Sequence, residues 1–129
     1  MGALFSAFHG SSSESSSESS LVLSFHSEAE WLKHFDSIKE TDQLMVIDFH
    51  ATWCAPCRFM EPLLIELASE HREVVFVKID VDELKEVARK WTVDAMPTFV
   101  LVKKGEEINR IIGASKDELL DQIRKHKSS

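Results

Sequence analysis

Cysteine is scarce in this chain of 129 residues, which contains only Cys54 and Cys57. The disulfides that hold a small secreted domain together join distant parts of its chain, and two cysteines this close cannot do so. A close cysteine pair in a protein without such a framework usually serves redox chemistry or metal binding. We therefore expect a protein of a reducing compartment.

Long apolar runs and clusters of basic residues are also missing. No stretch approaches the roughly 20 apolar residues of a transmembrane helix, and the N-terminus lacks the charged and apolar regions of a secretory signal. With a net charge of −7 and no stripe of Lys or Arg, the chain is not expected to bind nucleic acid. The chain has no glycine-rich nucleotide fingerprint, so we expect no bound cofactor. These absences favour a cytoplasmic protein.

Length and composition fit one compact domain preceded by a tail. A hydrophobic fraction of 43% with 29% charged residues is the ordinary balance of a globular protein, and the length is too short for two domains. Residues 11–20 read SSSESSSESS, a composition that cannot bury a core. We predict a disordered N-terminal extension over residues 1–20 and a folded domain over residues 21–129.

The extension begins MGALFS, which matches the pattern for N-myristoylation at Gly2. The alternative is an unmodified tail. A single acyl chain anchors a protein only weakly, and neither a cysteine nor a basic patch supplies a second signal nearby. The pattern therefore predicts at most a weak association with membranes.

Apolar periodicity divides the remaining residues into alternating strands and helices. Capping boxes, Ser27 with Glu30 and Ser115 with Glu118, begin the first and last helices. The order β-α-β-α-β-α-β-β-α predicts an α/β fold with a parallel sheet portion and a closing antiparallel hairpin at one edge. We expect strands at residues 21–25, 44–49, 74–79, 95–102 and 108–112, and helices at 27–38, 54–70, 82–90 and from 115 onward.

Both cysteines lie where a buried strand meets a helix, in the sequence Trp-Cys-Ala-Pro-Cys. Helical residues three apart lie one turn from each other, with Cα atoms roughly 5–6 Å apart, a separation that a disulfide tolerates. Cys54 would lie at the helix N-terminus, where free N–H groups and the helix dipole favour a thiolate. We infer a redox disulfide in which Cys54 is the nucleophile and Cys57 resolves the mixed disulfide. Pro56 would fix the first helical turn.

A zinc site and two unreactive buried thiols are the alternatives to a redox pair. Zinc requires about four ligands, and the chain has neither a second cysteine pair nor histidines at ligand spacing, so we expect no metal. Unreactive thiols fit poorly with the Trp and Pro residues around them.

Several separated motifs are similar to those of the thioredoxin family. They are the segment from Trp53 to Cys57, the preceding Val-Ile-Asp-Phe, and Met96-Pro97-Thr98. Met-Pro-Thr-Phe and Lys-Ile-Asp-Val-Asp-Glu-Leu resemble the plant h-type branch, particularly its forms with an N-terminal extension. The resemblance covers about residues 21–127. It implies the thioredoxin fold, a central mixed five-stranded sheet flanked by four helices, in a monomeric enzyme that reduces disulfides in target proteins.

The resemblance also implies roles for residues outside the cysteine pair. Asp48 matches the buried acid that transfers protons for Cys57, and a carboxylate in an apolar strand should have a raised pKa, as a base near neutral pH requires. Lys78 matches a position that can neighbour this acid, and Pro97 matches the cis-proline facing the dithiol. The alternatives are a structurally satisfied acid and a solvated lysine. The implied docking surface comprises Trp53, Ala55, Pro56, Ala95, Met96, Gly113 and Ala114.

Two residues depart from the family pattern. Ala55 stands where the family usually has glycine, a change compatible with a helix start that can alter the redox potential or the choice of partner. His50 replaces an aromatic residue and is either a packed histidine or a titrating group that tunes the dithiol.

The resemblance implies that electrons come from NADPH through a thioredoxin reductase, or by a route through glutathione and glutaredoxin. A chaperone or binding module on the same fold is the alternative function, although retention of both cysteines, Asp48 and Pro97 argues against it. Among enzymes, a disulfide isomerase or oxidase is the alternative, and the lack of a secretory signal argues against that.

Overall fold

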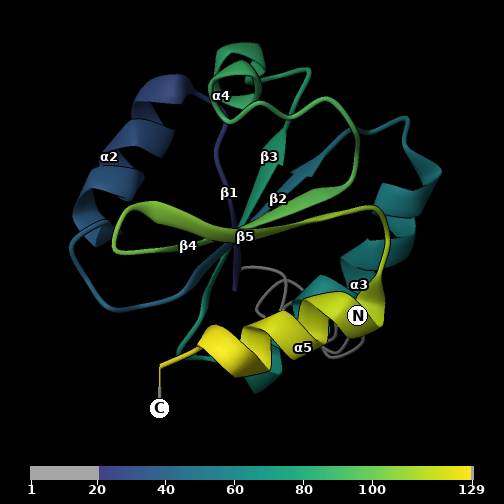
Figure 1. Ribbon diagram of the computed structural model, residues 1–129. Helices are drawn as coiled ribbons and strands as arrows, with labels where there is room; N and C mark the ends of the chain where they lie inside the picture. Colours follow the sequence, from purple (N-terminus) through teal and green to yellow (C-terminus); the bar gives the residue numbers. More distant parts are fainter. Residues whose placement is uncertain (1–20, 129) are drawn as a thin grey trace, which may run out of the picture.

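A computed structural model of the chain describes residues 21–128 (Figure 1). The predicted order of five strands and four helices is confirmed in this part of the chain. The predictions for residues 1–20, including Gly2, lie outside the described residues. The elements are β1 (Val22–Ser24), α2 (Glu28–Ile38), β2 (Met45–His50), α3 (Ala55–Glu70), β3 (Val75–Asp80), α4 (Lys85–Lys90), β4 (Thr98–Lys103), β5 (Glu106–Ile112) and α5 (Lys116–His126).

The five strands form one mixed sheet in the order β1-β3-β2-β4-β5. β1, β3 and β2 run parallel to one another, whereas β4 is antiparallel to β2 and β5 is antiparallel to β4. This is the thioredoxin fold that the motifs implied. β2 is the central strand, and its carboxyl end leads directly into the segment that contains the two cysteines.

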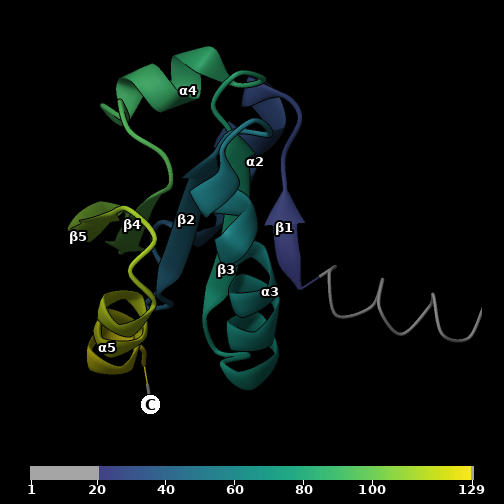
Figure 2. The same ribbon diagram turned by 90° about the vertical axis from the view of Figure 1, so that its right-hand side faces the viewer.

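Helices cover both faces of the sheet, with α3 and α5 on one face and α2 and α4 on the other (Figures 1 and 2). Alternation along β2 divides its side chains between the two faces. Val46 packs in the layer of α3 and α5, whereas Met45, Ile47 and Phe49 pack against α2 and α4. Asp48 alternates with these last three residues, so its side chain lies on the α3 face.

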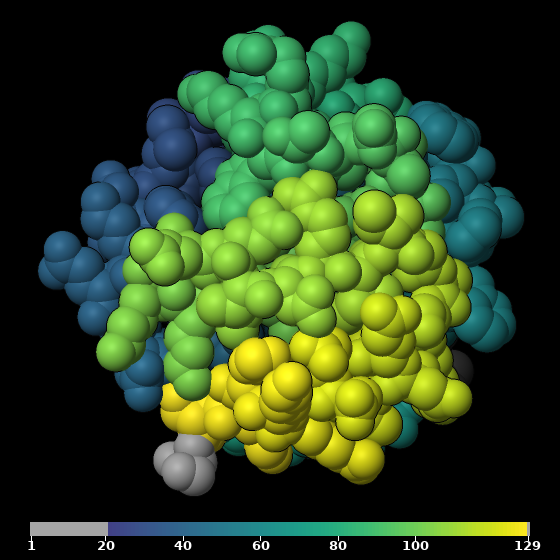
Figure 3. Space-filling view, in the orientation of Figure 1, coloured from purple at the N-terminus to yellow at the C-terminus, as the bar shows by residue number. Residues whose placement is uncertain are grey.

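The antiparallel edge of the sheet is a tight hairpin between β4 and β5. Its turn consists of Lys104 and Gly105, both with positive φ, as a two-residue turn that matches the strand twist requires. In the space-filling view of Figure 3, this hairpin crosses the middle of one face of the molecule, with α4 above it and α5 below it.

Three predicted starts were wrong by two or more residues, those of α4, β4 and β5. β5 begins at Glu106 and not at residue 108, because the turn takes only Lys104 and Gly105. In α4 and β4, side-chain or proline chemistry prevents regular structure. α4 begins at Lys85 and not at Asp82, because the carboxylate of Asp80 accepts the backbone N–H groups of Asp82 and Glu83 and holds a turn there. β4 begins at Thr98 and not at residue 95, because Pro97 has no N–H for the strand ladder.

The two predicted capping residues behave differently. Ser27 caps α2 with its hydroxyl oxygen, which accepts the Glu30 N–H at 3.1 Å. Ser115 occupies the same position before α5, but within the described residues its side chain makes no cap hydrogen bond, so this part of the prediction was wrong. No helix within residues 21–128 has the length and apolarity needed to span a membrane.

Candidate active site

The junction between β2 and α3 brings the two cysteines together as a disulfide. Cys54 is the N-cap of α3, and its sulfur accepts the backbone N–H of Cys57 at 3.2 Å. The Cα atoms of the pair are 5.3 Å apart, the separation of residues on neighbouring turns at a helix start. Pro56 occupies the first turn, where its missing N–H leaves no hydrogen bond unmade. The structure therefore represents the oxidised state of the pair.

The loop before β4 lies against this disulfide. Met96 packs on the small apolar cluster that includes both cysteines, and its carbonyl oxygen is 3.6 Å from the sulfur of Cys54. The Met96–Pro97 peptide bond is cis. The hydroxyl of Thr98 donates to the carbonyl of Ala95 at 2.6 Å, which ties the two ends of the loop together. Residues distant in sequence thus meet at the sulfur atoms.

Gly113 belongs to the same region because its N–H donates to the carbonyl of Pro97 at 2.8 Å. Its φ of +103° lies in the region that favours glycine. An added Cβ would meet no atom within 4 Å, so the backbone angle, and not the space, explains the glycine. The following residue, Ala114, is exposed beside the loop.

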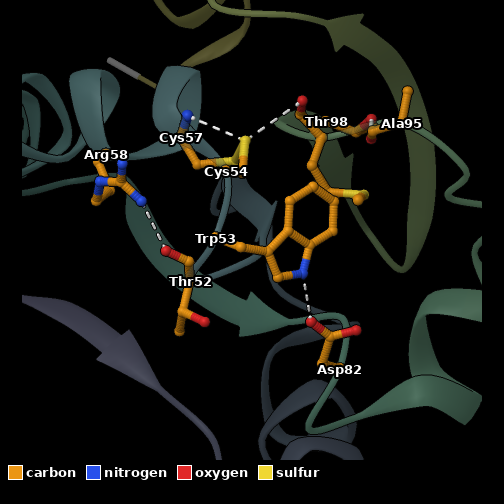
Figure 4. The surroundings of a disulfide bond; sticks show 9 residues. Thr52, Trp53, Cys54, Cys57, Arg58, Asp82, Ala95 and Thr98 are labelled. Carbon is orange, nitrogen blue, oxygen red and sulfur yellow. Dashed lines mark hydrogen bonds between the residues drawn. A yellow bond between two sulfur atoms is a disulfide. The ribbon is translucent and has the colours of Figure 1, made fainter.

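Trp53 presents its indole ring to solvent next to the dithiol, with 65% of its surface exposed. The ring N–H donates to the carboxylate of Asp82 at 2.8 Å, which fixes the orientation of the indole (Figure 4). Ala55 and Pro56 are exposed as well, whereas Ala95, Met96 and Gly113 are partly buried. The seven residues of the implied docking surface therefore all reach solvent or border the loop at the dithiol.

Three residues near this surface were not predicted from the sequence. Asp82 accepts the hydrogen bond from the indole of Trp53. The two residues are 29 positions apart, and their spacing in the sequence does not predict this contact. Phe59 is 73% exposed and lies one helical turn after Pro56, and Ile112 is 61% exposed next to Gly113. Exposed large apolar side chains at such positions extend the apolar area around the dithiol.

Asp48 is buried within β2, with 2% of its surface exposed. Its Oδ1 atom has no hydrogen-bond partner within residues 21–128. Burial raises the pKa of Asp48 from the ordinary value of 3.8 to about 7; the charge of Lys78 opposes this rise and that of Glu61 adds to it. A carboxyl group with this pKa can both accept and release a proton near neutral pH.

Lys78 is the direct neighbour of Asp48 on the adjacent parallel strand. Its ammonium group is ion-paired with the carboxylate of Glu61 on α3 and donates a hydrogen bond to it. Glu61 is the second charged group near Asp48, and the sequence reasoning missed it. The signal available was its position one helical turn after Cys57, which places it on the same side of α3.

His50, the second departure from the family pattern, lies at the end of β2 and is partly buried. It lines a pocket of about 170 Å³ together with Cys57 and Glu61. Burial is the main cause that lowers the pKa of His50, and Lys78 lowers it further, while nearby acidic groups act in the opposite direction. His50 therefore borders Cys57, and its lowered pKa favours the neutral imidazole.

No group of three or more His, Cys, Asp or Glu side chains within residues 21–128 is arranged to hold a metal ion. The two cysteines are joined to each other, which is the behaviour of a redox pair.

Comparison with known proteins gives a consistent family assignment. The family model described as Thioredoxin matches residues 24–125. Thioredoxin H2 of Arabidopsis thaliana is 51% identical over 130 residues, covering 97% of this chain and 98% of the relative. Thioredoxin H-type 1 of Nicotiana tabacum is 49% identical over 111 residues, covering 86% of this chain and 88% of the relative.

Solved structures agree with this assignment. The crystal structure of thioredoxin NaTrxh from Nicotiana alata superposes with a TM-score of 0.82 at 50% identity, covering 83% of this chain and 93% of that one. A chain from a structure described as the thiol resolving mechanism in yeast mitochondrial 1-Cys peroxiredoxin via glutathione/thioredoxin systems has a TM-score of 0.72 at 38% identity. The matched region covers 81% of this chain and 94% of that chain.

Proposed function

Because the chain belongs to the thioredoxin family and is a thiol–disulfide oxidoreductase that reduces disulfides in target proteins, we propose the residues that carry out each step. The Cys54 thiolate attacks one sulfur of a target disulfide, which forms a mixed disulfide and releases the other target sulfur as a thiolate. Cys57, once deprotonated, then attacks the sulfur of Cys54 and releases the second target sulfur. The released thiolates take up protons, so the target gains two thiols and the enzyme gains the Cys54–Cys57 disulfide.

The position of Cys54 supports its role as nucleophile. As the N-cap of α3 it receives the N–H of Cys57, and the helix dipole adds a positive potential at the same place. Both effects favour the thiolate over the thiol. Cys54 also borders the loop residue Met96, which is partly exposed, and this is where a target chain would approach.

Asp48 is proposed to take the proton of Cys57 when the mixed disulfide is resolved. Its raised pKa supports this role, because a base with a pKa of about 7 is partly ionised at neutral pH and still holds a proton well. Lys78 is proposed to influence this carboxyl group through its charge, since the two residues are neighbours on adjacent strands.

Target proteins are proposed to dock on the apolar area around the dithiol. The carbonyl oxygen of Met96 lies 3.6 Å from the sulfur of Cys54, and the next residue, Pro97, has no N–H, so an extended target segment can pair with the backbone of Met96 as an added strand. Trp53 would cover one side of that segment. The remaining members of the proposed surface are Ala55, Pro56, Ala95, Gly113 and Ala114.

The enzyme must be reduced again after each cycle. We propose that NADPH supplies the electrons through a thioredoxin reductase, with glutathione and glutaredoxin as a second route. The chain is proposed to act as a cytoplasmic monomer without a bound cofactor. Peroxiredoxin-like proteins are one proposed class of target, because a related chain belongs to a structure of a peroxiredoxin thiol resolving mechanism.

Residues 1–20 are proposed to form an extension outside the catalytic domain, which would span residues 21–129. The match of the family model to residues 24–125 supports a catalytic domain after the extension. Gly2 is proposed as a myristoylation site that gives a weak membrane association. Intact mass after co-expression with N-myristoyltransferase tests this; no acyl mass, under conditions that modify a control substrate, would remove the proposal.

A single observation carries the proposed mechanism: the Cys54–Cys57 disulfide lies at the N-terminus of α3 and faces the Met96–Pro97 loop. The test is the turbidimetric reduction of insulin with thioredoxin reductase and NADPH. We expect Cys54→Ser to abolish turnover and Cys57→Ser to accumulate a mixed disulfide with the target. If Cys54→Ser retained the wild-type rate, the assignment of the nucleophile would be wrong.

A further inference from the structure

We propose that Glu61 is a positioning residue that binds the ammonium group of Lys78, holds its charge away from Asp48, and leaves the Asp48 carboxyl able to take up and release a proton. This inference rests on the proposed function in one respect, since the catalytic value of that proton depends on the role assigned to Asp48. The contact itself between Glu61 and Lys78 does not depend on it.

Lys78 has two carboxylates within its reach. It is the register partner of Asp48 on neighbouring parallel strands, and both side chains project from the sheet face that α3 covers. Glu61 reaches the same place from α3. The ammonium group is paired with Glu61, whereas Oδ1 of Asp48 has no hydrogen-bond partner within residues 21–128. Lys78 therefore binds Glu61 and not Asp48, its register partner in the sheet.

Burial explains this choice. The Glu61 side chain is 48% exposed and that of Lys78 is 20% exposed, so their ion pair keeps part of its hydration. Asp48 is only 2% exposed. An ion pair with Asp48 would require the ammonium group to lose most of its water, which is the largest penalty for a buried ion pair. Glu61 offers an opposite charge at a smaller desolvation penalty.

Two charged groups of other elements act on Asp48, Lys78 from β3 and Glu61 from α3. Cys57 of α3 and His50 of its own strand border the same region as Glu61. The charge of Lys78 lowers the pKa of Asp48, and the charge of Glu61 raises it. Loss of the Glu61 charge would therefore act twice in the same direction, because it removes a negative charge and releases an ammonium group. The other elements of this layer contribute apolar side chains, among them Phe99, Leu119 and Ile123.

The location of Glu61 links this pair to the dithiol. Glu61, His50 and Cys57 line one pocket. The carboxylate of Glu61, which binds Lys78, therefore lies near Cys57, the residue proposed to lose a proton during resolution. A change at Glu61 is transmitted to the dithiol through Asp48, because Glu61 makes no hydrogen bond to either sulfur among the described residues.

The direct test is a pH titration of the Asp48 carboxyl carbon by NMR in the oxidised full-length protein, with Glu61→Gln compared with Glu66→Gln. Glu66 is exposed on the same helix, so its variant loses an equal charge away from Lys78. We expect Glu61→Gln to lower the pKa of Asp48 by about half a pH unit or more, a threefold change in proton affinity. A pKa that is unchanged, raised, or lowered equally by Glu66→Gln would overturn the proposal.

A second pair of variants tests whether Glu61 acts through Lys78. In a Lys78→Met background no ammonium group remains to be released, so Glu61→Gln should lower the pKa of Asp48 by much less than it does in the wild type. An equal shift in both backgrounds would show that Glu61 acts through its own charge alone, and the positioning role would be wrong.

The catalytic consequence is measured separately, as the pH dependence of insulin reduction. We expect the rise of the rate with pH to move to lower pH in Glu61→Gln, by the same amount as the pKa of Asp48. A shift in the NMR titration without a shift in the rate profile would support the role of Glu61 and overturn the proposed role of Asp48. The two failures are therefore distinguishable.

Discussion

Asp48 shows at the scale of one residue how burial raises the pKa of a carboxyl group and opposes folding when the group is charged. In the unfolded chain its carboxyl group ionises near 3.8, whereas in the folded protein its pKa is about 7. Between these two values the folded state binds a proton that the unfolded state releases. The contribution of Asp48 to stability therefore declines as the pH rises from about 4 to about 7, and the loss is complete above that range.

This difference predicts the stability of an Asp48→Asn variant, whose side chain cannot ionise. We expect the variant to be more stable than the wild type at about pH 8, by on the order of 2–4 kcal/mol, and to differ little near pH 4. Urea denaturation at the two pH values measures this. Equal effects at both pH values would mean that burial of the charge is not the cause.

The hydrogen bond between Trp53 and Asp82 gives a second prediction for single residues. Asp82→Ala removes the acceptor that fixes the indole, so we expect KM for a protein disulfide to rise by about fivefold, equivalent to about 1 kcal/mol. Asp82→Asn keeps an acceptor oxygen, so we expect a smaller rise of KM in this variant. Steady-state reduction of insulin measures the effect, and an equal rise in both variants would indicate loss of the charge and not of the hydrogen bond.

At the scale of the elements, the existence of each helix was predicted correctly, whereas some features of the helix starts were not. The motif Ser-x-x-Glu occurs before both α2 and α5, but only Ser27 makes the cap hydrogen bond. The start of α4 was placed three residues too early, because the apolar period gives no sign that Asp80 captures two N–H groups. Periodicity predicts that an element exists, whereas its first turn depends on one side-chain conformation.

The two caps form a matched pair for measurement. Ser27→Ala removes a real cap hydrogen bond and should lower the free energy of unfolding by about 1 kcal/mol. Ser115→Ala should lower it by a few tenths of a kcal/mol at most, because no cap bond is lost. Chemical denaturation of both variants compares them directly; a larger loss from Ser115→Ala would contradict the observed capping.

At the scale of the whole molecule, the sequence allowed the fold and the reacting residues to be predicted, because both follow from local patterns. The order of strands and helices determined the mixed sheet, and Cys54 and Cys57 lie within one motif. The contacts of Lys78 with Glu61 and of Trp53 with Asp82 could not be predicted in the same way. Each contact depends on which elements are neighbours in the fold, and on which of several nearby carboxylates binds the side chain.

The disulfide stabilises the fold less than one that closes a long loop would, because it closes a loop of only a few residues. Cys54 and Cys57 are three positions apart, and a loop this short restricts the unfolded chain by about 2 kcal/mol in the entropic model. We expect reduction to lower the unfolding free energy by about that amount while the far-ultraviolet circular dichroism stays unchanged. Unfolding on reduction would show that the disulfide holds the fold together.

Removal of residues 1–20 tests the proposed division of the chain. The sheet and both helical layers are built from residues after this segment, so the truncated protein should fold and should reduce insulin at the wild-type rate. The measurement is kcat/KM together with the melting temperature. A loss of more than about tenfold in kcat/KM would assign part of the docking surface to the extension.

The direction of β1 has a geometric consequence for how this enzyme could be tethered. β1 runs parallel to β3, and β3 runs parallel to β2, so β1 begins at the end of the sheet opposite the carboxyl end of β2, which leads to the two cysteines. Figure 2 shows the common direction of these strands. A tether attached before β1 would hold the molecule at the end of the sheet where β1 begins. The sulfur atoms would then point outward, towards whatever the tethered enzyme meets.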